Sequence, residues 1–100
     1  MKKTNIGAPR DKTHKFILFV SGMSSKSISA TENIRKIADE YLGDDMDLEI
    51  VDVSKDRQQA VQNQIIGLPT LVRVTPKPSR IILGDLSDKE KVLRILNINA

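Results

Sequence analysis

The sequence of 100 residues contains no cysteine and no tryptophan, and its aromatic side chains are two Phe and one Tyr. Without cysteine the chain can form no disulfide and offers no thiolate nucleophile, which excludes thiol–disulfide exchange. The single histidine, His14, has no second histidine or cysteine with which to hold a soft metal ion. We expect it to lie on the surface beside Lys15, where it cannot activate a serine. We therefore expect no catalytic residue, no metal and no cofactor.

Long apolar segments are also missing. No run approaches the roughly 20 apolar residues that a membrane-spanning helix needs. No apolar segment of a signal peptide follows the lysines at the N-terminus. We therefore expect a protein of the cytoplasm that does not contact the membrane. The fractions of hydrophobic and charged residues, 39% and 29%, are those of one ordinary soluble domain.

The net charge of +3 is unevenly distributed along the chain. Residues 1–15 carry five basic side chains and one acidic side chain, whereas residues 16–100 carry eleven basic and twelve acidic ones. Residues 39–52 hold seven carboxylates and no base, without the spacing or the glycine of a calcium loop, and we interpret them as a solvated surface. Nucleic-acid binding would need lysine and arginine gathered on the folded part, so we expect none.

The domain organisation follows from where apolar periodicity begins. Residues 1–14 contain Gly7, Pro9 and mixed charges without any periodicity, which predicts a flexible basic leader. Residues 15–100 then form one domain. The run 16–20 is entirely apolar, as in a central strand that is buried on both faces. The predicted strands are 16–20, 48–53, 70–74 and 80–83.

The first helix is predicted from apolar residues at i, i+4, i+7 and i+8 after the first strand. Ser29 with Glu32 fits a capping box, although Ser25 or Ser27 could cap a longer helix. Gly43 stands where a left-handed C-terminal cap belongs. A second helix is predicted over residues 56–64, with Asp56 and Gln59 as the capping pair. A last helix is opened by a capping box of Ser87 and Glu90.

The loop between the first strand and the first helix, residues 21–27, is rich in serine. We interpret its serines as caps for the free N–H groups of the helix. An anion site at the helix N-terminus with Lys26 is the alternative, which no phosphate-loop pattern supports.

The predicted order of elements is βαβαββα, and the segment Gly67-Leu68-Pro69-Thr70-Leu71 leads into the third strand. This arrangement resembles a thioredoxin-like α/β domain. In such domains the proline before the third strand is typically cis and faces the redox loop, whose place residues 21–27 take here. The missing thiol disfavours an enzyme of the thioredoxin superfamily, which is the third hypothesis and which a null result in a disulfide-reduction assay would close. Binding becomes the leading function.

Four segments in this order and spacing resemble the KaiB family, and the resemblance covers about residues 15–98. The segments are 17–22, 48–53, 67–71 and 80–93. The resemblance implies a non-enzymatic regulator in circadian or related timing and stress signalling. It would dock on a hexameric KaiC-like ATPase, with a KaiA-like protein or a histidine kinase as further partners. A stand-alone thioredoxin-like sensor module, similar to the KaiB-like domain of a clock-output histidine kinase, is the alternative function.

The resemblance also implies fold switching between a tetramer whose C-terminal half is refolded and a thioredoxin-like monomer that binds KaiC. That ground-state arrangement is the alternative fold class, and a homo-oligomer, either dimer or tetramer, is expected with it. The sequence is compatible with switching because residues 54–68 have only weak helical periodicity, whereas residues 16–53 are locally self-consistent.

Five residues are candidates for the switch or for partner contacts. Leu68, Pro69 and Thr70 lie at the expected switch point, and Gly84 and Asp85 precede the last helix. The alternative is that all five are ordinary turn residues.

Overall fold

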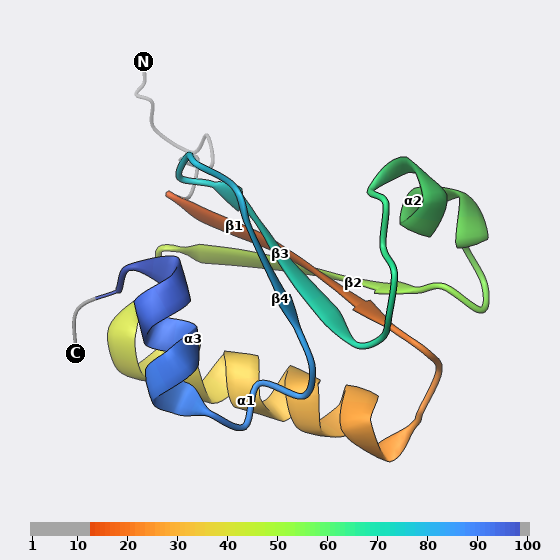
Figure 1. Ribbon diagram of the computed structural model, residues 1–100. Helices are drawn as coiled ribbons and strands as arrows, with labels where there is room; N and C mark the ends of the chain where they lie inside the picture. The colour runs from red at the N-terminus through yellow and green to blue at the C-terminus, as the bar shows by residue number, and fades with distance from the viewer. Residues whose placement is uncertain (1–12, 99–100) are drawn as a thin grey trace, which may run out of the picture.

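A single four-stranded sheet carries three helices in the computed structural model, which describes residues 13–98 (Figure 1). The elements are β1 (His14–Val20), α1 (Ser25–Tyr41), β2 (Met46–Asp52), α2 (Arg57–Gln62), β3 (Thr70–Thr75), β4 (Arg80–Leu83) and α3 (Lys89–Leu96). The predicted α/β order is confirmed, and each predicted strand is present within two residues of its expected bounds. Of the proposed leader, residues 1–12 lie outside the described residues, and His14 already belongs to β1.

The strands are ordered β2-β1-β3-β4. β1 and β2 pair in parallel, from His14 opposite Met46 to Val20 opposite Asp52. The β1–β3 and β3–β4 pairs are antiparallel. A parallel pair needs a crossover connection, which α1 provides, whereas antiparallel β3 and β4 need only the short turn after Thr75. β1 and β3 are therefore central, and β2 and β4 are the two edges.

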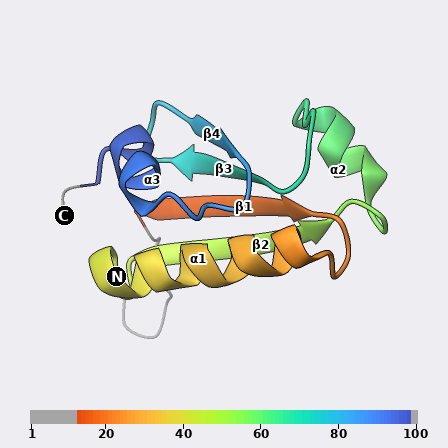
Figure 2. The ribbon, with the colours of Figure 1, turned by 60° about the horizontal axis from the view of Figure 1, so that its bottom comes forward.

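The helices cover the sheet unequally. α1 and α3 lie together on one face, and α2 lies on the other face at one end of the sheet (Figures 1 and 2). The larger core lies between the sheet and the helices α1 and α3. Its fully buried members include Phe16, Leu18, Ile34, Leu71 and Leu96. The opposite face carries a smaller cluster of Phe19, Val51 and Val72. Much of that second face is left without a helical cover.

α1 begins earlier than the Ser29–Glu32 capping box predicted. Its N-cap is Ser24, whose side chain accepts a hydrogen bond from the Ser27 N–H at 3.3 Å. Ser27 is itself buried in the first turn, so packing against the sheet selects the longer helix. The C-terminal prediction is confirmed: Gly43 has a φ of +58°, and its N–H donates to the Ala38 carbonyl at 2.9 Å.

Of the predicted N-caps of the other two helices, one is confirmed and one is wrong. Asp56 caps α2 as predicted and accepts from the Gln59 N–H at 3.4 Å, and the helix ends two residues before the predicted bound. For α3 the predicted capping box is wrong, because Asp88 is the N-cap and accepts from the Lys91 N–H at 3.1 Å. The Ser87 N–H is already bonded to the Asp85 carboxylate.

A buried arginine joins the last helix to the β3–β4 hairpin. Arg73 is 4% exposed, and its guanidinium donates to the carbonyl of Leu96 at the C-terminal end of α3. It also donates to the Pro78 carbonyl at 3.0 Å in the turn between the strands. Burial, with a smaller contribution from the nearby Arg80 charge, lowers the pKa of Arg73. Carbonyl dipoles stabilise this cation, including the one at the negative end of α3.

Truncation in the larger core should be far more costly than truncation on the open face. Leu71 is fully buried, whereas Leu83 on the neighbouring strand is 55% exposed. We expect Leu71→Ala to lower the free energy of unfolding by about 2–5 kcal/mol through lost burial and a cavity. The matched Leu83→Ala should cost about 1 kcal/mol or less. Urea unfolding followed by circular dichroism measures both, and equal losses would contradict the assignment of the core.

Candidate functional site

Three of the five candidate residues meet where the hairpin begins and ends. Pro69 precedes β3, Thr70 is the first residue of β3, and Gly84 follows β4. The Gly84 N–H donates to the Pro69 carbonyl at 2.9 Å, and Thr70 is the Cα partner of Leu83. The Leu68–Pro69 peptide bond is cis. Antiparallel pairing of β3 with β4 therefore brings together residues that are 15 positions apart in the sequence.

Asp85 follows Gly84 but makes its contacts elsewhere. Its carbonyl accepts from the Asn33 side-chain amide of α1 at 2.9 Å, and its carboxylate accepts from the Ser87 N–H at 3.0 Å. Hydrogen bonds from the Ser87 hydroxyl and the Ser87 N–H lower the pKa of Asp85. This residue thus fixes the connection between β4 and α3 against α1, and it does not join the other candidates.

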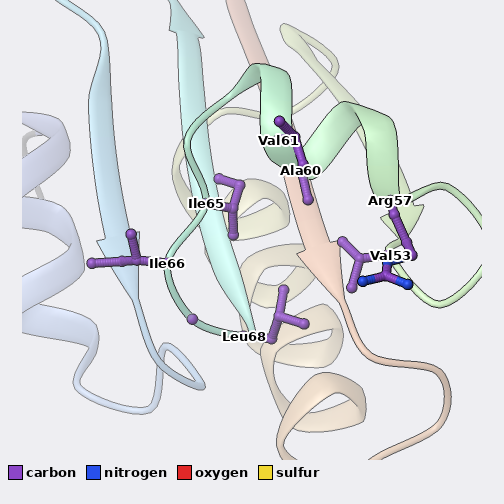
Figure 3. A pocket seen from close by; sticks show the side chains of 8 residues that line it. Val53, Arg57, Ala60, Val61, Ile65, Ile66 and Leu68 are labelled. Atoms are coloured by element: carbon purple, nitrogen blue, oxygen red, sulfur yellow. The ribbon is translucent and has the colours of Figure 1, made fainter.

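Leu68 is part of an apolar groove of about 340 Å³ beside α2, which we call the α2 groove. Figure 3 shows the side chains of Val53, Ala60, Val61, Ile65 and Leu68 around it, with Arg57 at one end. The complete lining is Val53, Arg57, Ala60, Val61, Ile65, Ile66, Gly67 and Leu68. Arg57 is the only charged side chain in this lining, so the groove suits an apolar surface rather than a polar small molecule.

The apolar surface continues past the α2 groove toward β4. In Figure 3 the Ile66 side chain, at the edge of the groove, extends toward β4. It lines a neighbouring hollow of about 170 Å³ together with Ile81 and Leu83. Ile66 is 94% exposed and Val61 is 76% exposed. Large apolar side chains gathered in this way mark an interaction surface.

Apart from Leu68, no residue of this surface was a predicted site residue. The signal that could have indicated this surface was the group Val61, Ile65 and Ile66. Their apolar stripe is too narrow for a helix that is packed on both sides. Their exposure depends on how α2 sits at the end of the sheet, which the local sequence does not specify.

The serine-rich loop is a helix-entry structure. Besides the Ser24 cap, the Ser27 hydroxyl oxygen accepts from the Ser21 N–H at 3.1 Å. The Gly22 N–H donates to the Asp52 carboxylate at 3.0 Å, and the Ser54 hydroxyl donates to the same carboxylate at 2.7 Å. Hydrogen bonds from the Ser54 hydroxyl, then from the N–H groups of Gly22 and Ser54, lower the pKa of Asp52. The Ser24 cap confirms the interpretation for that serine, whereas the Ser27 hydroxyl bonds the loop N–H of Ser21 and not an N–H of the helix.

His14 differs from the surface histidine that the sequence predicted. It is half-buried in β1, and its ring stacks on Phe16 with 6.4 Å between centroids. Within residues 13–98 no group of three or more His, Cys, Asp or Glu side chains is placed to hold a metal ion. In the same range no helix combines the length and the apolar character needed to cross a membrane.

The family model of the KaiB domain matches residues 17–98 of the chain. The circadian clock protein KaiB3 of Synechocystis sp. is 42% identical over 81 residues, which are 81% of this chain and 79% of the relative. The chain belongs to the KaiB family. The circadian clock oscillator protein KaiB of Microcystis aeruginosa is 40% identical over 82 residues, covering 82% of this chain and 79% of the relative.

Solved structures place this KaiB-family chain in the thioredoxin-like fold. The N-terminal domain of Synechococcus elongatus SasA has a TM-score of 0.71 at 18% identity, over 92% of this chain and 90% of that domain. Thioredoxin-2 of a malaria parasite has a TM-score of 0.72 at 17% identity, over 91% of this chain and 88% of that protein. The likeness to thioredoxins concerns the fold alone, whereas the KaiB relatives are named as clock proteins.

The lowered pKa of Asp52 predicts a specific loss of stability in acid. A carboxylate whose folded-state pKa is depressed stabilises the fold above its ordinary pKa, near 3.8, and this contribution is lost as the pH falls through the lower value. We expect Asp52→Asn to flatten the decline in unfolding free energy between about pH 5 and about pH 2, measured by urea unfolding at each pH. The exposed carboxylate Asp47 provides the control, because Asp47→Asn should keep the steeper decline of the native chain.

Proposed function

We propose that this KaiB-family chain is a non-enzymatic regulatory protein that docks on a KaiC-like hexameric ATPase in circadian or related timing and stress signalling. Family membership supports the clock context. The exposed apolar surface supports docking, and it is the single observation that carries the proposal. A KaiA-like protein or a histidine kinase would be a further partner.

The docking surface would be the α2 groove with its extension at Ile66, Ile81 and Leu83. Covering a fully exposed isoleucine removes enough apolar area from water to contribute about 1.5–3 kcal/mol. Arg57 at the end of the groove adds a charged contact that would orient the partner. A protein surface fits this shallow, open, elongated shape better than a compact metabolite does.

Regulation would come from the conformation of the C-terminal half. A partner that binds only the thioredoxin-like conformer draws the population toward it, and its apparent affinity falls in proportion to the fraction of chains in that conformer. The docking surface comes mostly from α2, from the segment after it and from β4, so refolding beyond residue 54 would dismantle it. The β1–α1–β2 unit supplies only Val53 to the groove and would be common to both conformers.

A stand-alone sensor module is the second candidate function. The SasA N-terminal domain supports it, because it overlays on nearly the whole described chain. A module of this kind would keep the thioredoxin-like conformer and stay monomeric.

Binding to a KaiC-like ATPase should depend on Ile66. We expect Ile66→Asp to raise the dissociation constant by about tenfold or more, because it places a carboxylate in the apolar contact. The side chain is 94% exposed, so the fold should be unaffected. Met23→Asp is the matched control, since Met23 is 84% exposed and lies in the loop after β1. Isothermal titration against the purified hexamer measures both, and native affinity for Ile66→Asp would refute this docking surface.

Gly84→Val separates the two candidate functions. Gly84 has a φ of +119°, where a β-branched residue is strained by about 1–3 kcal/mol. For a switching protein this strain should shift the conformer ratio about tenfold toward the other fold, seen as larger oligomers in sedimentation and as new amide resonances after residue 54. A stand-alone module should stay monomeric and become less stable. Gly22→Val, with a φ of +54° in the half common to both conformers, should leave the ratio unchanged.

A further inference from the structure

The outer edge of β4 has no neighbouring strand within residues 13–98. At the end of this strand the Gly84 N–H donates to the Pro69 carbonyl at 2.9 Å, and Leu83 lies opposite Thr70 of β3. In an antiparallel pair, residues whose N–H and C=O groups face the partner strand alternate with residues whose groups face away. Because Gly84 faces β3, the backbone groups of Ile81 and Leu83 face away from it. An added strand can therefore form hydrogen bonds with these two residues.

The side chains of the same two residues are apolar and exposed. Ile81 is 61% exposed and lies opposite Val72, which belongs to the smaller cluster on the sheet face away from α1 and α3. Leu83, two residues further along the strand, is on the same face and is also exposed. Ile66 extends toward β4 from the segment after α2 (Figure 3). The β4 edge therefore combines outward backbone groups with an exposed apolar surface.

The charges around this edge suit a second copy of the same strand. Arg80 is the only charged residue of β4 and stands at its first position. After the last position, a Cβ at Gly84 would have no atom within 4 Å other than those of its chain neighbours, so there is space for a side chain from outside. Asp85 follows directly. When two β4 strands run antiparallel, Arg80 of each copy approaches Asp85 of the other copy.

One register of the two strands uses all of these features. Residues directly opposite each other in an antiparallel sheet have their side chains on the same face. With a two-fold axis at Ile82, Ile81 of one copy lies opposite Leu83 of the other, and Arg80 lies opposite Gly84. Each of the two apolar pairs then exchanges both of its backbone hydrogen bonds. An axis at either apolar residue would instead set the other one opposite a polar residue.

The area of this surface determines how tightly two copies can pair. Ile66, Ile81 and Leu83 of both copies would together bury roughly 600 Å² of apolar surface, taking about 100 Å² for each side chain. Stable interfaces bury about 1,200–2,000 Å². A pair of this size is weak and reversible, with a dissociation constant on the order of 0.1 mM.

We propose that two copies of this chain pair through β4, antiparallel across a two-fold axis at Ile82, and so join their sheets into one. The pairing covers Ile81, Leu83 and the neighbouring Ile66, and it does not depend on the proposed function. One consequence does rest on that function. A KaiC-like ATPase that docks on these residues has to separate the two copies first, so its apparent affinity falls as the concentration of the chain rises.

Amide hydrogen exchange of the full chain, measured by NMR without any partner, tests the pairing. We expect the Ile81 and Leu83 amides to exchange about threefold or more slowly in about 1 mM protein than in about 50 µM protein. The Ile82 amide faces β3 and should be slow at both concentrations, which reports that the fold is intact. Equal rates for Ile81 and Leu83 at the two concentrations would overturn the proposal.

Complementary variants test the register. I81K and L83E each place a charge opposite an apolar side chain, so each should self-associate less than the native chain. Mixed in equal amounts, the two variants should associate about threefold or more tightly than either does with itself, because the introduced lysine lies opposite the introduced glutamate. Sedimentation equilibrium measures this association. Both positions are exposed, so circular dichroism should show the native fold.

The matched control mixes I81K with I81E. In the proposed register both introduced charges lie opposite Leu83, so this mixture should gain no affinity over its components. A gain in the control mixture would overturn the proposal, because the axis would then lie at Ile81. No gain in the mixture of I81K with L83E would overturn it as well.

Discussion

Burial of β1 on both faces is the constraint on which the remaining structure depends. The strand lies between β2 and β3, and its side chains alternate between the two cores. Phe16 and Leu18 pack under α1 and α3, whereas Phe19 belongs to the smaller cluster on the other face. A strand without polar side chains from Phe16 to Val20 cannot serve as an edge, so its neighbours on both sides are required. Each later element is placed by its relation to this strand.

The two faces of the sheet are covered to different extents. One face is covered by α1 and α3, and among the described residues only the short α2 covers the other face. Apolar side chains at Val61, Ile66 and Ile81 remain exposed as a result. In a thioredoxin the reactive thiols would follow β1, and here that position holds serines engaged in local hydrogen bonds. The docking surface that we propose lies instead on the open face of the sheet.

Much of the fold could be predicted because the strongly patterned segments are locally unambiguous. The strands around residues 16–20 and 80–83 are apolar and β-branched, and Gly43 ends α1 as its position suggested. The caps at Ser24 and Asp88 could not be predicted, since each lies among several residues with equal capping ability. Burial of Ser27 determines where α1 begins. The hydrogen bond from the Ser87 N–H to the Asp85 carboxylate determines where α3 begins.

The candidate site was predictable to the extent that the hairpin was. Pairing of β3 with β4 follows from the short turn between them, and it brings Pro69 to Gly84. The inward turn of Asp85 toward Asn33 depends on contacts 52 residues apart and has no local signal. The same holds for the α2 groove, whose walls come from Val53 directly after β2, from α2 and from the segment after α2.

The buried guanidinium of Arg73 has a mechanical consequence for the C-terminal half. It donates at once to the Leu96 carbonyl at the end of α3 and to the Pro78 carbonyl in the turn, and burial lowers its pKa. Pulling the helix away from the hairpin would strand a cation in an apolar layer until water reached it. Because α3 and the hairpin are bonded to the same guanidinium, a displacement of either element is transmitted to the other.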